Sequence, residues 1–179
     1  MAEMNEFVLQ CGALPTMTWL DGCSAGEEAI DELLEVARST GVAVFNIIPD
    51  RNYTTGSPDQ KLANLQKVVD ICRDLDMPLL GGTEINSPGQ KFVDDFDSEE
   101  LKPMHSQFLE GSRILHAHST LQRLAGMGYL SAWANDQFAA TSAKNEFYSR
   151  FGEIFSPRGD GALQNDLKDS LGSDEVISL

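Results

Sequence analysis

The segment 42–48 most constrains what this chain can fold into. It reads Val-Ala-Val-Phe-Asn-Ile-Ile, a nearly continuous run of apolar and β-branched residues. Such a run is typical of a strand that helices cover on both faces of a parallel sheet. A second strand is expected at 77–82. Both strands end in polar clusters, Pro49-Asp50-Arg51-Asn52 and Gly82-Thr83-Glu84-Ile85-Asn86, where parallel α/β folds place their reactive groups.

Helical patterns alternate with these strands. Residues 25–39 place apolar residues on one face, behind Ser24 as a candidate N-cap. Residues 58–76 do the same, with Ser57 as a candidate N-cap and Pro58 at the first helical position. With a short strand expected at 6–11, the pattern predicts a βαβαβ core.

The second half of the chain has a different pattern. A helix is expected near 101–110, and a helical region at 121–155 is broken by Gly126 and Gly128. The aromatic residues of that region are expected in the core or at an interface. The pattern at 113–118 leaves helix and strand open.

Length and composition predict one domain over residues 1–156 and a mobile acidic tail over 157–179. The net charge of -15 argues against nucleic acid or an anionic membrane surface as a partner. A bilayer-spanning apolar stretch and a signal peptide are not evident, so a cytoplasmic protein is expected. The three cysteines fit neither a disulfide framework nor zinc-ligand spacing, and we expect free thiols.

The strand-end clusters supply the candidate site. Asp50, Arg51 and Asn52 are candidates for binding a phosphate or a sugar, because a guanidinium fork matches such oxygens and Asp and Asn side chains can fix hydroxyls. Glu84 is a candidate metal ligand or general base, and Asn86 is a candidate substrate-binding residue by the same strand-end rule. Ordinary turn chemistry remains an alternative for 49–52, and Glu84 can instead pair with Arg51 structurally.

Two histidines have a spacing that depends on the local structure. His116 and His118 would share one face of a strand and could then bind a divalent metal, whereas on a helix they would not. Surface or packing roles are the alternative. Zn, Mn and Mg are all candidates for a metal at this site.

Three short motifs resemble the polymerase-and-histidinol-phosphatase (PHP) family of metal-dependent hydrolases. Leu20-Asp21-Gly22 is similar to the family's Ser-Asp-Gly loop, 49–52 to its Thr-Asp-His-Asn motif, and Gly81-Gly82-Thr83-Glu84 to its Pro-Gly-x-Glu motif. The resemblance covers about 11–86. It implies a parallel α/β (TIM-like) barrel, incomplete or distorted, with extra C-terminal helices.

The same resemblance implies metal-dependent hydrolysis of a phosphorylated or polyhydroxylated small molecule, with Asp50 and Glu84 as the surviving metal ligands and catalytic groups. The family's paired histidines are absent ahead of the first motif, and Arg51 stands where a ligand histidine would be. His116 and His118 are the candidates to replace them. An incomplete sheet would also need a second copy or a partner subunit to cover its open edge.

Two classes of function therefore remain open. The first is an enzyme, either the hydrolase or a sugar isomerase or epimerase of barrel type that uses Glu84. The second is a non-catalytic PHP-like module that binds a ligand or a subunit through its aromatic C-terminal region.

Overall fold

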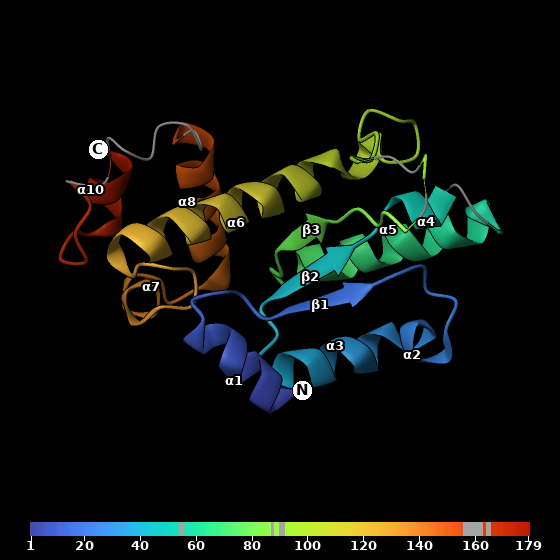
Figure 1. The fold of residues 1–179 in the computed structure, drawn as a ribbon, viewed down its shortest axis with the longest axis horizontal. Coiled ribbons are helices and arrows are strands. Elements are labelled where there is room, and N and C mark those ends of the chain that lie inside the picture. Colours follow the sequence, from blue (N-terminus) through green and yellow to red (C-terminus); the bar gives the residue numbers. More distant parts are fainter. Residues whose placement is uncertain (54–55, 87, 90–91, 156–162, 164–165) are drawn as a thin grey trace.

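A three-stranded parallel sheet forms the centre of the structure (Figure 1). The structure is a computed structural model and describes residues 1–53, 56–86, 88–89, 92–155, 163 and 166–179. The strands are β1 (Thr16–Trp19), β2 (Val44–Ile47) and β3 (Leu79–Gly81), in that order. The strand predicted at 42–48 is therefore the middle strand, as its apolar character indicates.

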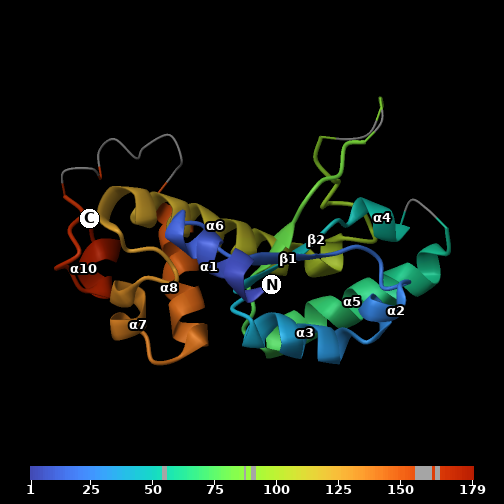
Figure 2. The same ribbon diagram turned by 60° about the horizontal axis from the view of Figure 1, so that its bottom comes forward.

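Helices cover one face of this sheet (Figure 2). They are α2 (Ala25–Glu28), α3 (Ile30–Ser39) and α5 (Pro58–Asp74). The predicted N-cap is confirmed, because the Ser24 side chain accepts the backbone N–H of Glu27. The expected single helix at 25–39 is interrupted at Ala29. The core on this face includes Trp19, Ile30, Leu34, Phe45, Ile47, Leu65, Val68 and Val69.

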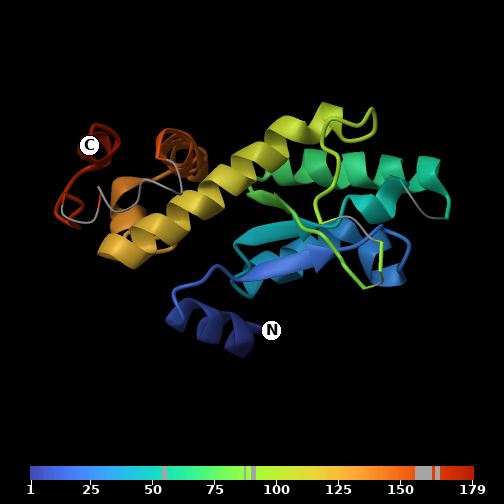
Figure 3. The ribbon, with the colours of Figure 1, turned by 45° about the horizontal axis from the view of Figure 1, so that its top comes forward.

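A long helix crosses from the sheet to the C-terminal half (Figure 3). After a short 3-10 turn, η1 (Lys102–Met104), helix α6 runs over His105–Ala125 and packs against β3. The segment 113–118 is thus helical. At Gly111 an added Cβ would lie 1.8 Å from the carbonyl oxygen of Leu79. The helix and the strand are that close because this residue carries no side chain.

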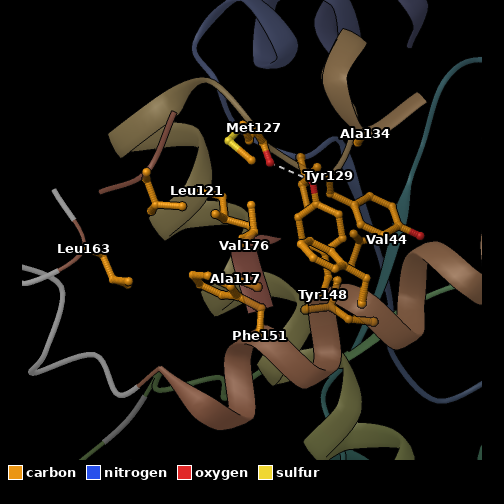
Figure 4. Close-up of a cluster of buried hydrophobic side chains, with 14 residues drawn as sticks. Val44, Ala117, Leu121, Met127, Tyr129, Ala134, Tyr148, Phe151, Leu163 and Val176 are labelled. Atoms are coloured by element: carbon orange, nitrogen blue, oxygen red, sulfur yellow. Dashed lines mark hydrogen bonds between the residues drawn. The ribbon is translucent and has the colours of Figure 1, made fainter. Parts of the chain in front are cut away.

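The C-terminal helices enclose a second core (Figure 4). They are α7 (Ala132–Gln137), α8 (Thr141–Ile154) and α10 (Ser173–Ile177). The aromatics expected in a core or interface are largely buried here, with Tyr148 and Phe151 fully enclosed. Of the predicted tail, residues 157–162 and 164–165 lie outside the described residues, while Val176 of α10 is buried in this core.

The expectation of a strand at 6–11 is wrong. Residues Ala2–Gln10 form helix α1, and the first strand lies at Thr16–Trp19 instead. The apolar triplet Phe7-Val8-Leu9 suits either state in so short a segment, and the strand that the sheet uses lies inside a stretch whose Pro and Gly residues indicate turns. Short helix α4 (Asp50–Tyr53) follows β2 directly.

The prediction of a TIM-like barrel is also wrong. The described residues form a single sheet of three strands, and a closed barrel of this kind needs eight. On the face away from α3 and α5, Thr16 and Thr18 of β1 are exposed, whereas Val44 is buried against the second core. The sheet is therefore open, with β1 at one edge.

The close contact between α6 and β3 can be tested with Gly111→Ala. An added methyl group would overlap the backbone of Leu79, so the free energy of unfolding should fall by about 2–3 kcal/mol. Urea unfolding measures the change. Gly26→Ala is the matched control, because its Cβ would meet nothing within 4 Å. Equal losses in the two variants would contradict the contact.

Candidate functional site

The carboxyl ends of β2 and β3 bring two of the predicted site residues, Arg51 and Glu84, together. Gly82 donates its N–H to the carbonyl of Ile47 at 2.7 Å, which holds the segment after β3 beside the end of β2. Arg51 follows β2 on α4, and Glu84 follows β3. Their side chains meet, with Nη1 of Arg51 2.5 Å from a carboxylate oxygen of Glu84. The strand-end rule thus identified two residues that are far apart in sequence and adjacent in space.

The Arg51–Glu84 pair is partly open to solvent, with 38% and 30% of the two side chains exposed. Hydrogen bonds from Arg51 and then from Asn86 lower the pKa of Glu84, and the carboxylate in turn raises the pKa of Arg51. Glu84 therefore stays ionised at neutral pH and is a weak proton acceptor. A general base works best with a pKa near the operating pH, so this setting does not suit Glu84 to that role.

Asp50 and Asn52 occupy different positions from Arg51. The backbone N–H of Asp50 donates to Oδ2 of Asp94 at 3.1 Å, and Asp94 is buried. Asn52 is fully buried, and its amide donates to the carbonyls of Leu20 and Ile48 at 2.9 and 3.1 Å. It joins the ends of β1 and β2 and is closed to solvent in this structure.

A second ion pair lies at the same edge and was not identified from the sequence. Nζ of Lys61 is 3.0 Å from Oδ2 of Asp21, and both side chains are largely buried. Burial acts to raise the pKa of Asp21, but hydrogen bonds from Lys61 and from the backbone of Cys23 outweigh it and hold the pKa below its usual value. The same Nζ lies 3.5 Å from the carbonyl oxygen of Arg51. Arg51 and Lys61 thus place two cationic residues at this edge of the sheet, each paired with a carboxylate.

The two histidines point in different directions from α6. Nε2 of His116 lies 2.8 Å from the carbonyl oxygen of Phe155 and so donates to it. His118 is held at both ring nitrogens: Nε2 donates to the carbonyl of Gly12 at 3.1 Å, and Nδ1 accepts the N–H of Tyr129 at 3.0 Å. Within the described ranges, no group of three or more His, Cys, Asp or Glu side chains is arranged to hold a metal ion.

A hollow of about 510 Å³ lies between the open face of the sheet and α6. Its floor contains Asn46 and Leu80, and its wall contains Ser112, His116 and Ser119 of α6. The amide of Asn46 also donates to Oγ1 of Thr18 at 3.3 Å, and this hydrogen bond holds the Asn46 side chain in place. Polar and apolar groups alternate around the hollow, a lining that suits a small polar molecule.

Comparison with family models, with curated proteins and with solved structures finds no match to this chain. The resemblance to the PHP family therefore rests on the three short motifs alone.

In the described part of the chain, none of the helices has the length and apolar character needed to cross a membrane. The cysteines Cys11, Cys23 and Cys72 are free thiols.

The enclosure of His118 predicts a pH dependence of stability. Burial lowers its pKa in the folded chain, whereas the unfolded chain has the ordinary value of about 6.5. Below about pH 6.5 the unfolded state binds more protons, so this contribution to stability is complete above that pH and is lost as the pH falls. The free energy of unfolding should therefore drop between pH 7 and pH 5.

Urea unfolding at pH 7, 6 and 5 measures this drop, and His118→Gln should flatten it. Carboxylates with a lowered pKa, such as Glu84 and Asp21, also contribute to the free energy of unfolding, but they lose that contribution only below the pH range in which His118 is protonated. His105→Gln, which leaves His118 in place, is the matched control. An unchanged slope in His118→Gln would contradict the enclosed neutral imidazole.

Proposed function

We propose that this chain is a non-catalytic binding module that takes a phosphorylated or polyhydroxylated small molecule at the carboxyl edge of its sheet. The observation that carries the proposal is the presence of two cations, Arg51 and Lys61, at that edge, each beside a carboxylate. Open parallel sheets bind ligands at this edge, outside the carboxyl ends of their strands.

The chemistry of the pair supports such a ligand. A guanidinium group binds the oxygens of a phosphate through two parallel hydrogen bonds, and Arg51 has more than a third of its side chain exposed. Glu84 is ionised and accepts hydrogen bonds from hydroxyl groups. Asn86, exposed beside it, adds an amide that can donate and accept. Donors and acceptors together match a sugar phosphate.

The binding proposal is favoured over metal-dependent hydrolysis by the positions of the candidate ligands. His118 has both nitrogens bonded to backbone groups, and Nε2 of His116 is bonded to another. Glu84 is bonded to Arg51, whose positive charge disfavours a cation beside it. Asp50 is the remaining candidate ligand, and one carboxylate is fewer than a catalytic metal site uses.

Thermal unfolding with added ligand tests the proposal. Glucose 6-phosphate at about ten times its dissociation constant should stabilise the chain by about 1.4 kcal/mol, which raises Tm by about 3–5 °C at this size. Arg51→Lys should weaken the shift, because the charge remains and the fork is lost, and Arg51→Ala should abolish it. Arg73→Ala is the matched control, because Arg73 is an exposed arginine paired with Asp70 and Asp74 on α5. Loss of the shift in both alanine variants, or no shift in the unaltered chain, would overturn the proposal.

Elemental analysis separates binding from metal-dependent hydrolysis. Protein purified without a histidine tag should contain no stoichiometric Zn, Mn or Mg, and Glu84→Ala should leave the metal content unchanged. Stoichiometric metal that disappears in Glu84→Ala would instead support the hydrolase or isomerase. Phosphatase activity on glucose 6-phosphate would be the next measurement in that case.

A further inference from the structure

The outer edge of β1 has unused pairing capacity. Val44 donates to the carbonyl of Pro15 on the β1 side, whereas Phe45 donates to the carbonyl of Pro78 on the β3 side. This alternation and the register of Thr16 with Val44 direct the peptide groups of Met17 and Trp19 toward β2. The peptide groups of Thr16 and Thr18 therefore point away from the sheet.

Two of the features that protect edge strands, charged residues and proline, are absent from β1 itself. Native edges carry charged residues or proline, and Thr16–Trp19 contains neither. Its carboxyl end is closed, because Oε1 of Glu27 accepts the outward N–H of Leu20 at 2.6 Å. The free part of the edge is thus limited to the strand itself.

Apolar side chains are exposed on the elements next to this edge. Helix α1 lies beside the start of β1 in all three views (Figures 1–3). Its only buried residue is Asn5, which donates to the carbonyl of Thr40. Met1 at the start of α1, Met4 and Phe7 on α1, and Val36 on α3 are 53–64% exposed. A surface of this kind is typical of a contact with another protein.

We infer that this face binds a second copy of the same chain through antiparallel pairing of the two β1 strands. A two-fold axis at Met17 sets Thr16 of each copy opposite Thr18 of the other. All outward peptide groups of both threonines are then used, in four hydrogen bonds. The threonine side chains form cross-strand pairs, which are favourable opposite each other. The edge is therefore complementary to itself, and the two sheets join into one of six strands.

Mass measurement tests this inference. Light scattering after size exclusion, and sedimentation equilibrium over a range of concentrations, should give twice the mass of the chain. Thr16→Lys/Thr18→Lys should raise the dissociation constant of the dimer about tenfold or more, because each lysine then faces another lysine. The side chains of both threonines are exposed, so circular dichroism should show an unchanged monomer fold.

A charge exchange makes the test independent of folding defects. Thr16→Glu/Thr18→Glu should also be monomeric, and a mixture with the lysine variant should restore the mass of a dimer. Gln60→Lys/Gln66→Lys, which adds the same charge to exposed positions of α5, is the matched control and should remain dimeric. A monomer at every concentration measured, or dimers of normal affinity in the lysine variant, would overturn the inference.

Discussion

The arrangement of the whole chain depends on the close backbone contacts of α6 at two glycines. Gly111 brings α6 against the carbonyl of Leu79 in β3, and Gly152 of α8 lies against the carbonyl of Arg113 in α6. Phe108 of α6 is buried in the core beneath the sheet, and Ile114 in the core of the C-terminal helices. This helix thus joins two cores that would otherwise be separate. The second half of α6 packs against the C-terminal core, and its two histidines therefore hydrogen-bond to backbone groups of other segments.

Local signals predicted the elements that local chemistry determines. The β-branched run gave β2, and Ser24 and Pro58 marked helix starts correctly, although the Ser57 side chain makes no capping hydrogen bond. The sequence-based predictions were wrong where tertiary contacts determine the secondary structure. Helix α1 is held by the hydrogen bond from Asn5 to Thr40, 35 residues away, and β1 is a strand because it pairs with β2. Neither contact has a signature in the segment itself.

The candidate site shows the same division. Arg51 and Glu84 were predictable because both follow strands of one parallel sheet, a rule that converts sequence position into spatial proximity. Lys61 was not, since a helix side chain reaches the edge only through the packing of α5. His116 and His118 were placed on one face only under the assumption of a strand, and the helix turns them apart.

The electrostatics of the edge narrow the class of ligand that the proposed binding site would accept. The chain carries a net charge of -15, and the two cations at the edge are already balanced by Glu84 and Asp21. A bare anion would therefore meet repulsion at long range and a neutralised guanidinium at short range. When Arg51 turns to a phosphate, Glu84 loses its hydrogen bond from the guanidinium group. A ligand whose hydroxyl groups donate hydrogen bonds to Glu84 would replace that lost contact. This exchange favours a sugar phosphate over inorganic phosphate, because only the former satisfies both members of the separated pair.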